Sequence, residues 1–117
     1  MQISYMLKKL FGGKVAEQVL LYLQNYDEGY GKGIADTFGI ALSSVQKQLQ
    51  KFEESGLLVS RLVGKSLVYT WNPRSPYVES LKTLLAQRLK LTPEEEIKIY
   101  YRQRRRPRRK GKPLENS

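Results

Sequence analysis

The chain has 117 residues and a net charge of +10, and it contains neither cysteine nor histidine. Disulfides, thiolate metal sites and cysteine nucleophiles are therefore excluded, and so is histidine, the most common general base and transition-metal ligand. Because no apolar run approaches the roughly 18 residues that cross a bilayer, we expect a cytoplasmic, non-enzymatic protein of one domain, with no cofactor, no metal and no membrane partner.

The first part of the chain predicts three helices. Apolar residues recur at helical spacing over residues 3–11 and again over 14–25, with two glycines between the segments. Residues 26–33 are rich in glycine and acidic side chains, which predicts a turn. A short third helix follows over 34–38, and Gly39 is placed to end it.

A fourth predicted helix, over residues 42–55, has two chemically different faces. With 100° of rotation per residue, Val45, Leu49 and Phe52 fall on one narrow arc, which predicts a buried seam. The opposite side is polar and includes two lysines. The alternative interpretation of that side is a solvated helix face without a ligand.

Beyond the fourth helix the hydrophobic period changes. Residues 57–71 alternate like strands and predict a hairpin with its turn near Gly64. Ser75 followed by Pro76 predicts the cap and the first position of another helix, which carries several leucines. The sequence Thr-Pro-Glu-Glu over 92–95 matches a capping box and predicts a short last helix.

The last 16 residues, 102–117, carry eight basic residues and only one acidic residue. A block of like charges repels itself and cannot build a core, so we expect a disordered tail whose partner is a polyanion. If phosphates neutralised all eight of these basic residues, the log–log salt slope of binding would become more negative by about 7. The alternative is a tail that only aids solubility. Its candidate phosphate contacts are Arg104, Arg105, Arg106, Arg108 and Arg109.

This order of elements predicts a mainly α fold with a small β-hairpin wing, the winged helix-turn-helix, followed by C-terminal helices and the tail. The chain from about Leu10 to Leu89 resembles the ArsR-type winged-helix transcriptional regulators, and especially the domains that begin with LFG and sometimes accompany nucleotidyltransferases. The matching pieces are LFGGKVAEQVLLYL, IADTFGIALSSVQKQLQKFEESGLL, RLVGKSLVYTWN and NPRSPYVESLKTLL. The resemblance implies a homodimer that binds operator DNA through its winged helix, with the first and last helices packed together.

We divide the chain into a winged helix-turn-helix domain with flanking dimerisation helices (1–91), a short C-terminal helix (92–101) and the basic tail (102–117). Two leucine-rich stripes are too apolar for a free surface and predict the dimer seam, although the core of a single chain is the alternative. These stripes comprise Met6, Leu7 and Leu10 in the first helix and Leu81, Leu84 and Leu85 in the later one. Metal-sensing members of that family bind metal through Cys, His and carboxylate clusters, and this chain lacks Cys and His, so we expect no metal. The alternative is a hard cation at Glu94, Glu95 and Glu96, but consecutive exposed glutamates are usually a solvated helix start.

In a helix-turn-helix the second helix enters the major groove, where glutamine pairs with adenine and lysine with guanine. The candidate contacts on that helix are Ser43, Ser44, Gln46, Lys47, Gln50 and Lys51. Three further candidates lie on the wing, Arg61, Lys65 and Ser66, where the alternative is a charged tip that only prevents edge pairing. Lys14 and Lys32 are further candidates for phosphate contact.

Two functional hypotheses follow. The first is a sequence-specific, double-stranded DNA-binding regulator, a dimeric repressor associated with the nucleoid. The second is a non-specific architectural DNA-binding or RNA-binding protein in which the tail dominates. Deletion of residues 102–117 distinguishes them, because a regulator keeps its preferred site whereas an architectural protein loses nearly all binding.

Overall fold

The structure is a computed structural model that describes residues 3–103, with side chains from residue 7 onward. The tail residues 104–117, including all five candidate arginines there, lie outside the described residues. The elements, in chain order, are α1 (Ile3–Phe11), α2 (Lys14–Tyr26), β1 (Glu28–Tyr30), α3 (Gly31–Phe38), α4 (Leu42–Glu54), β2 (Leu58–Val63), β3 (Ser66–Trp71), α5 (Val78–Lys90), α6 (Glu94–Glu96) and the π-helical segment η1 (Ile97–Tyr101).

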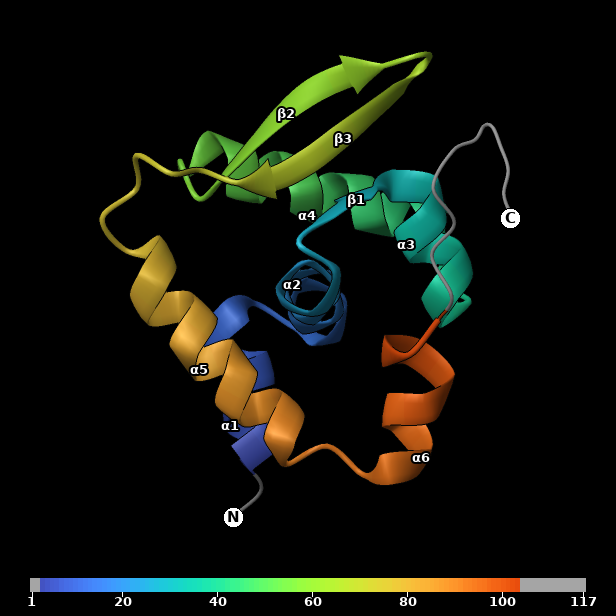
Figure 1. Cartoon of the computed structure of the whole chain (residues 1–117), viewed down its shortest axis with the longest axis vertical. Helices are drawn as coiled ribbons and strands as arrows, with labels where there is room; N and C mark the ends of the chain where they lie inside the picture. Colours follow the sequence, from blue (N-terminus) through green and yellow to red (C-terminus); the bar gives the residue numbers. More distant parts are fainter. Residues whose placement is uncertain (1–2, 104–117) are drawn as a thin grey trace.

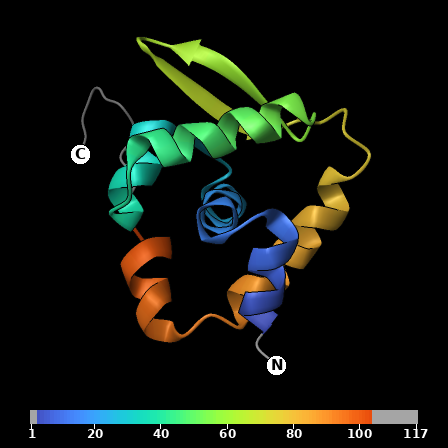
Figure 2. The ribbon, with the colours of Figure 1, turned by 180° about the vertical axis from the view of Figure 1, so that it is seen from behind.

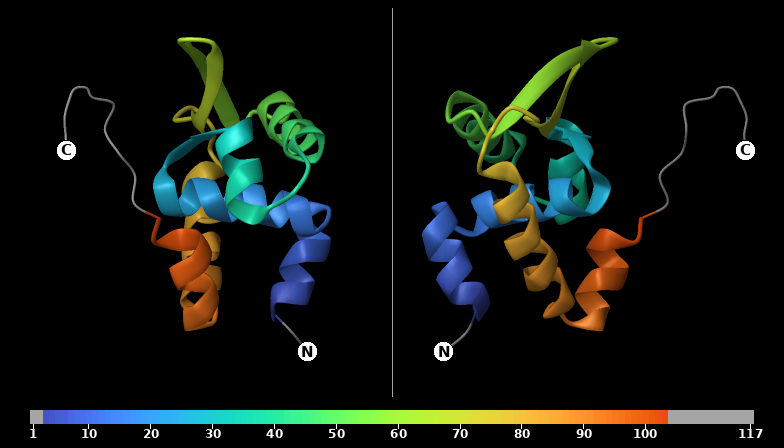
Figure 3. Two further views of the ribbon diagram at one scale, coloured as in Figure 1. Left: turned by 90° about the vertical axis from the view of Figure 1, so that its right-hand side faces the viewer. Right: turned by 60° about the vertical axis from the view of Figure 1, so that its left-hand side comes forward.

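Helix α2 runs through the middle of the molecule, and the other elements surround it (Figures 1 and 2). It contacts α1, α3, α4, α5, β1 and η1. A helix that is covered on several sides must be apolar on several sides, and α2 has a continuous run of buried residues from Val19 to Leu23. Figure 3 shows the result: α4 and the wing lie at one end of the molecule, and α1, α5 and α6 lie at the other.

The predicted hairpin is confirmed. Strands β2 and β3 pair antiparallel from Leu58 opposite Trp71 to Val63 opposite Ser66, and Gly64 in the turn has a φ of 61°. This positive φ favours glycine, which explains why the turn lies there.

The predicted turn over 26–33 is wrong in part, because it contains strand β1, which pairs antiparallel with the other side of β3. Gly29 pairs with Tyr69 and lies directly against α2. A Cβ at Gly29 would lie 2.7 Å from Cε1 of Tyr22. The glycine therefore serves a close approach of strand to helix, and its presence made the segment resemble a simple turn.

The predicted helix-turn-helix core is confirmed. Val45, Leu49 and Phe52 of α4 are all buried, and they join Ile34 and Ala35 of α3 in one hydrophobic core. Gly39 ends α3 in the left-handed conformation, with a φ of 66°. The apolar seam of α4 therefore determines which of its faces remains outside.

Both capping predictions for the C-terminal helices are wrong. Helix α5 begins at Val78, and Ser75 instead accepts a hydrogen bond from the Tyr77 N–H at 3.3 Å, in the turn before the helix. The hydroxyl of Thr92 accepts a hydrogen bond from Nη1 of Arg88 at 2.7 Å and donates one to the Arg88 carbonyl at 3.0 Å. It therefore does not cap α6. Arg88, in the preceding helix α5, binds the Thr92 hydroxyl that a capping box would use.

Residues 97–103, which we call the strap, bind back onto α2 and α3. The Tyr26 hydroxyl donates to the Tyr100 carbonyl at 2.7 Å, and the Asn25 amide donates to the Tyr101 carbonyl at 2.7 Å. The ring of Tyr100 lies 5.1 Å from that of Phe38 at the end of α3, centroid to centroid. The strap thus shares the core of the preceding helices and places the start of the basic tail beside α3.

The leucine stripes do not form one surface. Leu7 and Leu85 are buried within the chain itself, so neither is available for a seam between two chains, and their prediction as seam residues is corrected. Helices α1 and α5 each pack on α2, and this packing covers both leucines. Leu81 is half-buried, Leu10 and Leu84 are exposed, and the side chain of Met6 lies outside the described residues.

A buried ion pair joins α2 to α5. Nε of Arg88 lies 3.1 Å from Oε2 of Glu17, and the two side chains are 12% and 5% exposed, respectively. Because Thr92 also accepts a hydrogen bond from Arg88, the guanidinium is held at two points. A buried pair of this kind contributes mostly through the penalty that either charge would suffer alone.

We predict that Arg88→Met lowers the free energy of unfolding by about 3–5 kcal/mol, because it leaves the Glu17 carboxylate buried and unpaired. The double variant Glu17→Met/Arg88→Met should recover most of this loss, because both charges are then absent. Urea denaturation of the three proteins measures the effect. Equal losses in the single and double variants would contradict a role for the pair.

Candidate nucleic-acid interface

The outer face of α4 presents the polar side chains that the sequence predicts for it. Ser43, Gln46, Lys47, Gln50 and Lys51 are exposed and Ser44 is half-buried. Figure 2 shows α4 running across the molecule next to the wing.

The N-terminal end of α4 lacks a side-chain cap. Its cap residue is Ala41, which has no side-chain acceptor, whereas the Ala41 carbonyl already accepts the N–H groups of Ser44 and Val45 at 3.1 and 3.3 Å. The first N–H groups of a helix normally need a side chain, water or a ligand as acceptor. This end of α4 therefore offers donors and a positive dipole to an anion such as phosphate.

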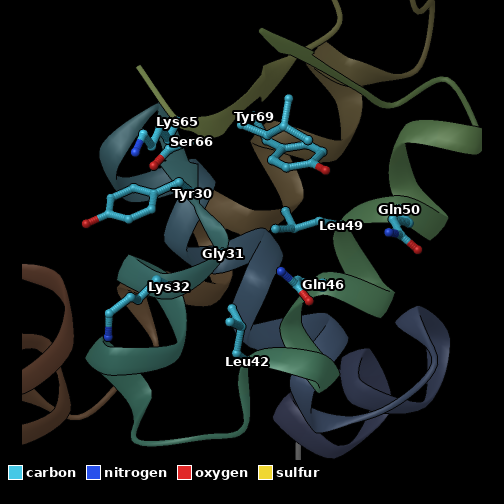
Figure 4. Close-up of a pocket in the computed structure, with 11 residues that line it drawn as sticks. Tyr30, Gly31, Lys32, Leu42, Gln46, Leu49, Gln50, Lys65, Ser66 and Tyr69 are labelled. Carbon is cyan, nitrogen blue, oxygen red and sulfur yellow. The ribbon is translucent and has the colours of Figure 1, made fainter. Parts of the chain in front are cut away.

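A groove of about 390 Å³ separates α4 from the wing (Figure 4). It brings together five of the predicted residues: Gln46 and Gln50 along α4, Lys65 and Ser66 on the wing, and Lys32 in α3. The two α4 residues precede the two wing residues by 15 or more positions, and they share the groove because the hairpin, whose strand β2 contacts α4, lies beside the helix.

The groove also contains apolar residues that the sequence analysis missed. Tyr30, Leu42 and Leu67 line it, and all three are among the exposed large hydrophobic residues of the chain. Sequence patterns could have signalled only Leu42, which lies at the margin of the apolar arc of α4. Apolar side chains at such a position can contact the methyl group of thymine.

Two other predicted residues lie in a different place. Ser44 and Lys47 line a hollow of about 260 Å³ on the other side of α4, together with Gly12, Gly13 and Lys14 at the start of α2. Four of the six predicted contacts of α4 therefore fall into two pairs on different sides of the helix. Lys14, a candidate for phosphate contact, lies with the second pair.

Three of the candidate cations already have contacts within the chain. Nζ of Lys51 donates to the Phe11 carbonyl at 3.2 Å and lies 4.9 Å from the centroid of the Phe52 ring. Arg61 pairs with Glu28 at 3.0 Å, and Lys32 pairs with Asp36 at 3.2 Å. Both ion pairs are exposed and contribute little to stability, so either cation can exchange its carboxylate for a phosphate.

Neither a membrane span nor a metal site finds support in residues 3–103. None of the helices there is long and apolar enough to span a membrane. In the same part of the chain, no three Asp or Glu side chains are grouped so that they could hold a metal ion. The exposed Glu94 instead pairs with Arg102 at 2.7 Å.

No protein-family model matches this sequence, and no curated protein matches it. Solved structures do match its fold. The antimony-specific transcriptional repressor AntR superposes with a TM-score of 0.56 at 18% identity, over 74% of this chain and 77% of AntR. Reduced HlyU from Vibrio cholerae superposes with a TM-score of 0.55 at 19% identity, over 76% of this chain and 90% of HlyU. A variant of ZitR from Lactococcus lactis in its apo form superposes with a TM-score of 0.52 at 16% identity, over 85% of this chain and 89% of ZitR. The chain therefore has the winged-helix fold of these proteins.

Truncation of a side chain to alanine should change stability much more on the buried face of α4 than on its exposed face. Leu49→Ala should lower the free energy of unfolding by about 2–5 kcal/mol, because it opens a cavity under the helix. Gln46→Ala, one turn earlier on the exposed face, should change it by no more than about 0.5 kcal/mol. Thermal and urea denaturation compare the two. A large loss for Gln46→Ala would show that this side chain supports the fold and is not free for a ligand.

Proposed function

We propose that this chain is a DNA-binding transcriptional regulator that acts as a dimeric repressor. The observation that carries the proposal is the groove between α4 and the wing. The amides of Gln46 and Gln50 and the ammonium of Lys65 line this groove, and the opposite face of α4 is buried. One protein of the same fold, AntR, is a transcriptional repressor, which supports the assignment to regulation.

Each group on this surface has a suitable role on duplex DNA. Gln46 and Gln50 carry amides that can pair with adenine in the major groove, and Lys47 can donate to guanine. The uncapped N–H groups at the start of α4 suit a phosphate oxygen. Lys65 and Ser66, at the wing turn, suit the sugar-phosphate backbone or the minor groove. Arg61 would join them by leaving Glu28.

The basic tail would add affinity without sequence information. Residues 104–117 contain seven basic residues and one acidic residue, which suits contact with phosphates along the duplex. The strap ends at Gln103, whose N–H donates to the Tyr26 hydroxyl at 3.0 Å. The side chain of Gln103 also accepts a hydrogen bond from Thr37 of α3 at 3.3 Å, so the chain leaves the described structure beside α3.

A dimer would use the apolar surface that remains open on α1 and around α5. Leu10, Leu84 and Leu91 are 67%, 36% and 60% exposed, and these elements lie at the end of the molecule away from the wing (Figure 3). Two chains joined there would present two copies of α4 to half-sites about 10 base pairs apart, or a multiple of that spacing.

The DNA-binding proposal is tested by selection from randomised duplex DNA, followed by affinity measurements on the enriched site. Gln46→Ala and Lys47→Ala should each relax the preference at one base position by about 1–3 kcal/mol. The matched variants Gln87→Ala on α5 and Lys98→Ala on η1 remove the same side chains elsewhere and should leave the preference unchanged. A site preference that survives both α4 variants would contradict readout by this helix.

Deletion of residues 104–117 separates a regulator from a non-specific binder. The truncated chain keeps the strap and should still select the same site, while the log–log salt slope becomes less negative by up to about 6. Loss of both the site and the binding would instead favour an architectural or RNA-binding protein in which the tail is the main contact.

The dimer has its own test. Leu84→Glu should place a charge in the seam and lower the mass measured by sedimentation equilibrium from that of a dimer to that of a monomer. Leu62→Glu makes the same change at an exposed position of the wing and should leave the mass unchanged. A Leu84→Glu protein that still sediments as a dimer would place the seam elsewhere.

A further inference from the structure

A second cavity, of about 350 Å³, lies at the end of the molecule away from the wing. Its walls come from α1, α2, α5, α6 and η1, elements that Figure 1 shows arranged around the region beneath α2. The cavity is at the lower end of the range of small-molecule sites, about 300–1,000 Å³. None of the residues assigned to DNA contact on α4 or the wing lines it.

The walls are polar and have an excess of positive charge. The buried Arg88 and Glu17 line the cavity and neutralise each other at 3.1 Å. Lys8 and Lys14 also line it, against the single remaining carboxylate of Glu96. Neither lysine ammonium has an ion-pair partner among the described side chains. The cavity therefore favours a ligand with an anionic group.

One of the wall residues also has an unsatisfied acceptor. Gln18 lines the cavity, and its buried Oε1 has no hydrogen-bond partner among the described residues. A buried acceptor without a partner is unfavourable, and a ligand hydroxyl or amino group would relieve it. Tyr101 also lines the cavity; a tyrosine hydroxyl is a neutral donor at physiological pH, and burial raises its pKa further.

We propose that this cavity binds a small organic anion that also carries a hydroxyl or amino group. The anionic group would lie toward Lys8 and Lys14, and the donor would satisfy Gln18. Hydroxy acids and phosphate esters of small polyols share this chemistry and match the volume.

The position of the cavity would let such a ligand affect α3 through the strap. Tyr100 and Tyr101 line the cavity and belong to the strap, whose carbonyls are held by Tyr26 and Asn25 at the end of α2. The rings of both tyrosines pack on Phe38. A ligand that orders the strap would therefore stabilise the support of α3 and the start of the basic tail. This effect on DNA binding rests on the proposed function, whereas binding of the ligand does not.

Two probes with matched controls test the binding. Malate and glycerol 3-phosphate each carry an anionic group and a hydroxyl, whereas succinate lacks the hydroxyl and glycerol lacks the anion. They are titrated into the full-length chain, and binding is followed by NMR, including the side-chain amide of Gln18. At least one probe should bind with a Kd of about 1 mM or tighter, and its control about tenfold more weakly.

Three variants locate the site. Gln18→Leu should weaken the probe by about tenfold or more, yet melt no lower than the original chain, because it removes an unpaired buried oxygen. Lys8→Gln should weaken the probe too, whereas Lys98→Gln removes an equal charge on η1 outside the cavity and should have no effect. These results support the site whether or not the chain selects a DNA sequence.

Other results would overturn the proposal. Failure of both probes to bind at about 10 mM would do so, and so would equal binding of malate and succinate that is insensitive to Gln18→Leu. A Gln18→Leu protein that melts well below the original would show that the amide oxygen already has a partner. If a probe binds as expected but leaves the affinity for the selected DNA site unchanged, the site stands and the coupling through the strap is rejected.

Discussion

The burial of helix α2 on several sides is the constraint on which the rest of the structure depends. A chain of this size can build one core, and here that core surrounds a single helix whose residues from Val19 to Leu23 are all buried. Every element that covers α2 must give it an apolar face, which leaves the opposite face of that element outside. Both candidate sites arise in this way, one at each end of the molecule.

At the wing end, this constraint makes α4 a helix with one buried and one open face. Its seam is made of apolar side chains at helical spacing, and burial of this seam directs the polar face outward. The wing extends beyond the helix because only the inner half of the hairpin reaches the core: Leu58, Tyr69 and Trp71 are buried, whereas Leu62 and Leu67 are exposed. A groove therefore forms between helix and wing.

At the other end, polar groups hold the elements together. Helix α5 is fixed to α2 by the Arg88–Glu17 pair, and the strap is fixed by hydrogen bonds to its carbonyls from Asn25 and Tyr26. Polar contacts leave more polar surface between elements than apolar packing does, and the second cavity lies among them. This end therefore combines a firm attachment with the polar cavity that we propose as a ligand site.

Much of the fold could be predicted from the sequence because it depends on local periodicity. The arc of Val45, Leu49 and Phe52, the end of a helix at Gly39 and the turn near Gly64 are properties of short segments, and each prediction was confirmed. The exposed face of α4 followed from the same arc. The two wing residues that reach the groove, Lys65 and Ser66, followed from the position of the turn.

The parts that could not be predicted depend on contacts between distant residues. Strand β1 requires β3 as a partner, 40 residues away in register, and its glycine is typical of a turn. Thr92 was expected to cap a helix, but Arg88 binds its hydroxyl. The burial of Leu7 and Leu85 depends on the packing of α1 and α5 against α2. The contacts of Lys51 and Arg61 with Phe11 and Glu28 were equally invisible in the sequence.

The central claim is that α4 and the wing together contact duplex DNA. The most direct measurement is the change in backbone amide NMR shifts of the full-length chain when duplex DNA is added at about 0.15 M salt, where exposed charges are partly screened. The account predicts that the largest changes occur over residues 42–50 and 64–67, with α5 little affected. Changes confined to residues 104–117 would contradict it and leave the basic tail as the nucleic-acid contact.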